Sequence, residues 1–207
     1  MSARRLVLIL SNASFAVAIT ATHGLGQPDI SFRAGHIYLS ISESEPCDQG
    51  GMGREWIVEI NPWTGARTIF ADSDDGICAI SGLIFSRDGR RLLLINSGHV
   101  SPFDGGWIQS FSPDGTSEII LDETDGFLRP RGSNGIAFDR NGDLFVVSAS
   151  DSKIIRFPKG QGPGIVFADS SDGIVGRGGL AFAPNGDLFY GSGATNKILR
   201  ITPTGGL

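Results

Sequence analysis

The chain has 207 residues, of which 40% are apolar, and a formal net charge of −5 at neutral pH. This length and composition are typical of one globular domain. The acidic balance argues against nucleic acid or an anionic membrane surface as a partner, because both need basic patches.

The N-terminus has the pattern of a secretory signal peptide over residues 1–21, because two arginines precede an apolar run at 6–20. Small residues around Ala18 offer a cleavage site, and removal of Arg4 and Arg5 brings the net charge to −7. We therefore expect a secreted or periplasmic protein with no membrane contact after cleavage. An uncleaved N-terminal anchor is the alternative.

The first group of predicted strands begins with a hairpin, 29–33 and 36–42, turned at Ala34-Gly35. Further strands follow at 55–60 and 68–71. Between them lies a loop that is longer than a strand connection needs, which favours a functional role. It carries Glu43, Glu45, Cys47 and Asp48.

The second group contains Gly82-Leu-Ile-Phe85, the turn Arg87-Asp-Gly89 and Leu92-Leu-Leu-Ile95, followed by an insertion at 96–106 that holds His99 and Asp104. Cys47 and Cys78 are the only cysteines, and an even pair in an exported chain predicts a disulfide. Two free buried cysteines are the alternative.

The third group defines a repeat: a strand at 135–138, an Asn-Gly hairpin signal at 141–142, and strands at 143–148 and 153–157. The fourth group repeats the pattern at 179–182, 188–190 and 197–201. The opening glycines Gly82, Gly135 and Gly179 are 53 and 44 residues apart, which fits a propeller blade of roughly 40 to 50 residues.

A related phrase ends each of the first three groups: Phe70-Ala-Asp-Ser-Asp-Asp-Gly-Ile77, Leu121-Asp-Glu-Thr-Asp-Gly-Phe127 and Phe167-Ala-Asp-Ser-Ser-Asp-Gly-Ile174. Aspartate accepts local backbone hydrogen bonds and glycine takes a positive φ, so the phrase predicts a turn between blades. A calcium-binding loop is the alternative.

Together these patterns predict an all-β β-propeller over residues 28–207. Its blades of four antiparallel strands span approximately 28–76, 77–126, 127–173 and 174–207. The last blade is incomplete, so the whole chain is predicted to contain about fifteen strands. Because an unclosed array exposes strand edges, we expect either a fragment of a six-bladed propeller or an open or oligomerising array.

The phrases Ser133-Asn-Gly-Ile-Ala-Phe-Asp-Arg-Asn-Gly-Asp-Leu-Phe-Val146 and Asn196-Lys-Ile-Leu-Arg-Ile-Thr-Pro-Thr-Gly205 resemble NHL repeats, the gluconolactonase/regucalcin-like propellers and streptogramin lyase repeats. In gluconolactonase-like enzymes a divalent metal is held by a Glu, an Asn and an Asp. The resemblance implies Asn134 as the Asn ligand, whereas the Glu and Asp motifs have no counterpart here. Alternatively, Asn134 bonds its own turn backbone.

No catalytic motif was found, so no catalytic residue is assigned. We expect a ligand- or protein-binding module for a polar small molecule or a peptide. The alternative is a metal-dependent lactonase with calcium or zinc at the top of the central channel. The candidate binding-face residues are Glu43, Glu45, Asp48, Asn96, His99, Asp104, Arg129, Arg131, Asp151 and Arg177.

Overall fold

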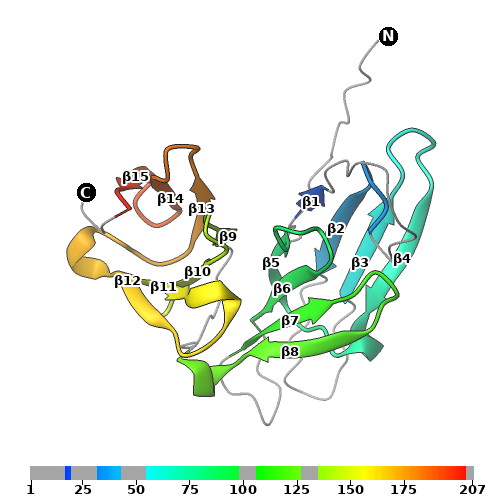
Figure 1. The fold of residues 1–207 in the computed structure, drawn as a ribbon, viewed down its shortest axis with the longest axis horizontal. Coiled ribbons are helices and arrows are strands. Elements are labelled where there is room, and N and C mark those ends of the chain that lie inside the picture. The colour runs from blue at the N-terminus through cyan, green and yellow to red at the C-terminus, as the bar shows by residue number, and fades with distance from the viewer. Residues whose placement is uncertain (1–16, 20–31, 43–54, 98–105, 127–134, 204–207) are drawn as a thin grey trace.

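The computed structural model describes residues 17–19, 32–42, 55–97, 106–126 and 135–203. These residues form four antiparallel sheets that follow one another in chain order around an open arc (Figure 1). The first strand of each sheet lies toward the inside of the arc and contacts the first strand of the next sheet. This is the arrangement of a partial β-propeller with four blades.

Sheet 1 consists of β1 (Val17–Ile19), β2 (Ile37–Ser42), β3 (Glu55–Ile60) and β4 (Arg67–Asp72), in that order. Its innermost strand is β1, which lies within the predicted signal peptide and pairs with β2. The predicted strand at 29–33 is therefore not the innermost one. Of its residues, Phe32 and Arg33 are described and neither is in a strand, because Arg33 begins the turn that leads into β2.

Sheet 2 consists of β5 (Ile80–Phe85), β6 (Leu92–Asn96), β7 (Trp107–Phe111) and β8 (Ser117–Leu121). The central strands β6 and β7 are buried at every residue. Continuous burial of this kind is expected where both faces of a sheet are covered by neighbouring sheets.

Sheet 3 consists of β9 (Ile136–Phe138), β10 (Leu144–Ser148), β11 (Lys153–Phe157) and β12 (Ile165–Ala168). The strands predicted at 143–148 and 153–157 match β10 and β11 to within one residue.

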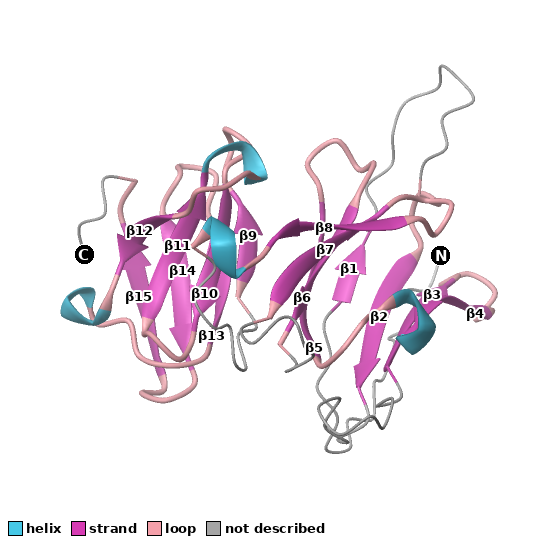
Figure 2. Ribbon diagram, turned by 90° about the horizontal axis from the view of Figure 1, so that it is seen from below, coloured by secondary structure: helices cyan, strands magenta, loops and turns pink. Residues whose placement is uncertain are grey.

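Sheet 4 consists of β13 (Gly178–Phe182), β14 (Leu188–Ser192) and β15 (Lys197–Ile201). The described residues thus contain fifteen strands, and sheet 4 has three where the other sheets have four. In Figure 2 sheets 3 and 4 overlap on the left of the view, and sheets 2 and 1 follow to the right.

Three hydrophobic cores join the four sheets. The first lies between sheets 1 and 2 around Ile57 and Leu94, the second between sheets 2 and 3 around Ile108 and Val146, and the third between sheets 3 and 4 around Tyr190. Each sheet therefore depends on its neighbours for burial, as in other repeat architectures.

The Asp-Gly phrases form the predicted turns between sheets. Each contains a short 3₁₀ helix: η2 (Ser73–Asp75), η3 (Glu123–Asp125) and η5 (Ser170–Asp172). The preceding aspartate caps each helix in a capping box, and the following glycine has a φ of 78°, 81° or 80°. A fourth 3₁₀ helix, η4 (Pro158–Gly160), follows β11, and no described helix is long and apolar enough to cross a membrane.

The first strands of sheets 3 and 4 approach closely at Gly135. A Cβ at this position would lie 2.4 Å from the carbonyl oxygen of Gly178 and 2.6 Å from Cγ2 of Val147. The glycine that opens the repeat is therefore required by packing between the inner strands.

The outer face of each terminal sheet has no described sheet packed on it. On sheet 4, Ile198 is 76% exposed and Phe189 is partly buried, and on sheet 1 Ile69 is 58% exposed. Ile201, in contrast, is fully buried in the third core, because side chains in a strand alternate between faces.

Candidate functional site

Most of the residues predicted from the sequence lie outside the described part of the chain, and their roles stay predictions. These are Glu43, Glu45, Cys47, Asp48, His99, Asp104, Arg129, Arg131 and Asn134. The structure places Cys78, Asn96, Asp151 and Arg177.

Asn96 is fully buried at the end of β6, where its side chain links sheet 2 to the preceding connection. Its Oδ1 accepts a hydrogen bond of 2.7 Å from the N–H of Cys78, and its Nδ2 donates one of 3.1 Å to Oε1 of Gln109. Gln109 in turn donates to the carbonyl oxygen of Asp75 at 2.8 Å and to Ser117 at 3.0 Å. Both ends of the Asn96 amide are thus engaged in holding this connection.

Asp151 and Arg177 are both exposed. Asp151 accepts a hydrogen bond of 2.6 Å from the hydroxyl of Ser148 in the turn after β10, while Arg177 precedes β13. No hydrogen bond or ion pair joins Asn96, Asp151 and Arg177 to one another.

Cys78 is buried, with 4% of its surface exposed. Its predicted disulfide partner Cys47 is not among the described residues, so the bridge stays a prediction. The described residues also contain no group of three or more His, Cys, Asp or Glu side chains that could hold a metal ion.

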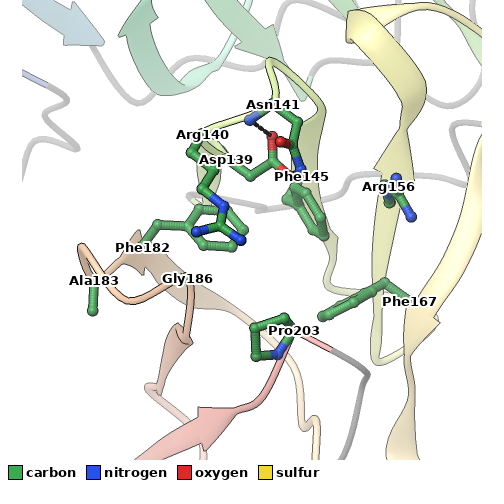
Figure 3. Close-up of a pocket in the computed structure, with 10 residues that line it drawn as sticks. All are labelled: Asp139, Arg140, Asn141, Phe145, Arg156, Phe167, Phe182, Ala183, Gly186 and Pro203. Atoms are coloured by element: carbon green, nitrogen blue, oxygen red, sulfur yellow. Dashed lines mark hydrogen bonds between the residues drawn. The ribbon is translucent and has the colours of Figure 1, made fainter.

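A pocket lies between sheets 3 and 4, at the end of the sheets where the first strand of each turns into the second. We call this the hairpin end; the turn that contains Asp151 lies at the opposite end of sheet 3. The pocket has a volume of about 120 Å³. Figure 3 shows the residues that line it: Asp139, Arg140, Asn141, Phe145, Arg156, Phe167, Phe182, Ala183, Gly186 and Pro203.

Three phenylalanine rings form the apolar part of this pocket. Phe145 lies on β10, Phe167 on β12 and Phe182 at the end of β13. The ring of Phe145 is 5.0 Å from that of Phe167 at an interplanar angle of 90°, and 4.9 Å from that of Phe182 at 73°. These edge-to-face contacts fix the orientation of the rings. Phe145 is buried, with 3% of its surface exposed, so the partly buried Phe167 and Phe182 offer most of the aromatic surface to a ligand.

Arg156 lies in the pocket wall, but its charge is compensated by a buried carboxylate. Its Nε and Nη2 donate to Oδ2 of Asp143 at 2.8 and 2.5 Å, and the N–H of Lys159 donates to Oδ1 at 3.0 Å. Burial raises the pKa of Asp143, but these hydrogen bonds and the Arg156 charge outweigh it, so that the pKa is below its usual range. Asp143 is therefore ionised at neutral pH.

Arg140 lies in the hairpin between β9 and β10, is exposed, and lines the same pocket. Within the described part of the chain, its guanidinium has no hydrogen-bond or ion-pair partner. The neighbouring Asp139 carboxylate instead accepts from the N–H groups of Asn141 and Asp143 at 2.8 and 2.9 Å, which shapes the hairpin. Arg140 is thus a cation at the pocket that is available to an anionic group.

The sequence prediction placed candidate residues only at the opposite end and missed this pocket. The sequence did contain an indication of this pocket, because Phe145 is the second residue of β10 and Phe182 is the last residue of β13. Whether such rings enclose a cavity depends on packing between blades, which residue patterns do not specify.

Comparisons with known proteins support the fold. No protein-family model matches this sequence, and no curated protein matches it. Among solved structures, a putative gluconolactonase is similar with a TM-score of 0.59 and 20% identity, over 82% of this chain and 58% of that chain. Virginiamycin B lyase from Staphylococcus aureus is similar with a TM-score of 0.58 and 16% identity, over 93% and 53%.

A third similar structure is regucalcin from Agrobacterium tumefaciens, a calcium-binding protein, with a TM-score of 0.57 and 14% identity over 84% of this chain and 70% of that one. The chain thus spans a little over half the length of the gluconolactonase and the lyase. At these identities the likeness establishes a shared propeller fold.

Proposed function

We propose that this chain is an NHL-like β-propeller that acts as a ligand-binding module and takes a small molecule in the pocket between sheets 3 and 4. The observation that carries the proposal is the Arg140 guanidinium, which has no partner among the described residues and lies beside three aromatic rings in edge-to-face contact. Aromatic side chains together with a few convergent polar groups are common in the lining of small-molecule sites. A cavity of about 120 Å³ favours a small molecule over a folded protein partner.

The proposal also includes export through the signal peptide at 1–21, which is supported by the two arginines and the apolar run that follows them. Since β1 lies within this segment, cleavage after Ala21 would remove it from sheet 1. N-terminal sequencing of the exported protein would locate the cleavage site. A mature chain that begins at Met1 would contradict export with cleavage.

The alternative function is a metal-dependent lactonase. Its support is the likeness in fold to the putative gluconolactonase, together with the Asn134 motif. This alternative needs calcium or zinc, with at least three oxygen ligands around Asn134. Calorimetric titration separates the two functions: micromolar metal binding that is lost in Asn134→Ala would favour the lactonase.

A fragment screen tests the ligand-binding proposal without assuming a ligand class. Two-dimensional NMR of the isotope-labelled chain would be recorded with small aromatic, aliphatic and sugar-like fragments. We expect some fragments to shift signals of Phe145, Phe167 and Arg140. Fragments that bind only at the opposite end, or none that reach the pocket, would contradict the proposal.

A further inference from the structure

The cores at the two ends of the array contain the same arrangement of three rings. Between sheets 1 and 2, Tyr38 lies 5.3 Å from Phe70 at 89° and 5.4 Å from Phe85 at 86°. Phe145, Phe167 and Phe182 occupy the matching strand positions between sheets 3 and 4, with separations of 5.0 and 4.9 Å. The match follows from the repeat, because Tyr38 and Phe145 are each the second residue of the second strand.

The first of these two clusters is completed by a fourth ring from the chain itself. The ring of Phe32 lies 5.3 Å from that of Tyr38, 5.6 Å from that of Phe70 and 4.9 Å from that of Phe85. Phe32 is 6% exposed and belongs to the first core. A fourth aromatic ring is therefore accommodated by this arrangement of three.

Against the second cluster lies the pocket of about 120 Å³. An engineered cavity of about 150 Å³ in another protein accepts benzene, so the volume of this pocket is in the range of a single six-membered ring. The core between sheets 2 and 3 lacks the feature, because Leu93, Ile120 and Phe138 stand at the corresponding positions.

We propose that this pocket binds a small monocyclic aromatic carboxylate, whose ring packs on Phe145, Phe167 and Phe182 as Phe32 packs in the first cluster. The carboxylate accepts hydrogen bonds from Arg140 at the rim. Arg156 contributes less, because Asp143 already compensates its charge. The inference rests on the proposed function, and it adds the ligand class.

The ring requirement follows from geometry. Edge-to-face contacts between aromatic rings are favourable beyond the area that they bury, and a saturated ring of equal size does not make them. The anion requirement follows from Arg140, since a guanidinium presents donors that match a carboxylate in pairs.

The test is a titration of the 207-residue chain with phenylacetate, phenylacetamide and cyclohexylacetate, followed by two-dimensional NMR. Phenylacetate is expected to bind with a Kd on the order of 1 mM, as suits a ligand of this size. Cyclohexylacetate is expected to bind several-fold more weakly because it lacks the aromatic face.

Two variants separate the charge from a general surface effect. Arg140→Gln is expected to weaken phenylacetate binding by about fivefold to tenfold and to leave phenylacetamide binding unchanged. Arg87→Gln is the matched control, because Arg87 occupies the equivalent hairpin of sheet 2 and is also exposed. It is expected to change neither affinity.

Three results would overturn the inference: no phenylacetate binding up to about 10 mM, equal binding of cyclohexylacetate, or equal effects of the two arginine variants. If fragments of another class still bind in the pocket, the ligand-binding function stands and only the ligand class is wrong. If nothing binds there, both proposals fail.

Discussion

Removal of the Asn96 side chain is expected to destabilise the fold, because this amide joins sheet 2 to the connection that precedes it. Asn96→Ala would leave the N–H of Cys78 and Oε1 of Gln109 without their partners in a fully buried site. An unsatisfied buried polar group costs about 1–3 kcal/mol. For two such groups, with partial relaxation, we expect a loss of about 2–4 kcal/mol in the free energy of unfolding.

This loss is a large part of the whole stability, since domains are stable by about 5–15 kcal/mol. With an m-value of about 2 kcal/mol/M, the urea midpoint would fall by about 1–2 M. Unfolding can be followed by tryptophan fluorescence, because Trp107 is buried at the start of β7.

Asn141→Ala serves as the control, because Asn141 is exposed and, among the described residues, its side-chain amide donates only to Asp139, at 3.2 Å. It should change stability by less than about 0.5 kcal/mol. A double-mutant cycle with Gln109→Ala should give a coupling of about 0.5–3 kcal/mol, since the two amides share a hydrogen bond. If Asn96→Ala were as mild as the control, the structural role assigned to this amide would be wrong.

Three further predictions concern acid stability, association and the disulfide. The pKa of Asp143 is lowered in the folded protein, so its stabilising effect is complete above the unfolded pKa of about 3.9 and is lost as the pH falls through the folded value. The Asp143→Asn variant should therefore be less stable than the wild type at pH 7, and its free energy of unfolding should fall less as the pH is lowered. An equal fall in both proteins, measured by urea unfolding at a series of acid pH values, would contradict this. Because the outer face of sheet 4 exposes Ile198, the 207-residue chain expressed by itself should self-associate, and Ile198→Lys should raise the monomer fraction in light scattering; a monodisperse wild-type monomer would refute the argument. For the exported protein, mass spectrometry should find Cys47 linked to Cys78, a closure of 31 residues worth on the order of 3–4 kcal/mol; alkylation of both thiols without reduction would remove the claim.

The repeat made much of this fold predictable from the sequence. Period-two strands, Asn-Gly hairpins and the recurrent Asp-Gly phrase are local signals, and each corresponds to a strand or turn in the structure. The prediction was wrong at the innermost strand of sheet 1, where β1 pairs with β2. A short apolar run such as Val17–Ile19 has no local feature that distinguishes a strand from a signal peptide.

The pocket depended on information that local patterns lack. Phe32 precedes the turn that leads into β2, and Phe182 precedes the hairpin between β13 and β14; yet Phe32 adds a fourth ring to the first cluster, while Phe182 is one of three rings at the pocket. Whether a fourth ring fills the space beside the other three depends on how the chain runs between blades, and local residue patterns do not specify this. Asn96 shows the same limit, since its position at the start of a long insertion is visible in the sequence, whereas the burial and hydrogen bonding of its amide are set by packing.

A crystal structure of the chain soaked with phenylacetate would test the central claim most directly, because it would locate a ligand relative to the sheets. We expect electron density for one aromatic ring against Phe145, Phe167 and Phe182, with the carboxylate at Arg140. We expect no such density between sheets 1 and 2, where Phe32 packs against the equivalent rings. An empty pocket, or a ligand bound only at the opposite end of the sheets, would contradict the account.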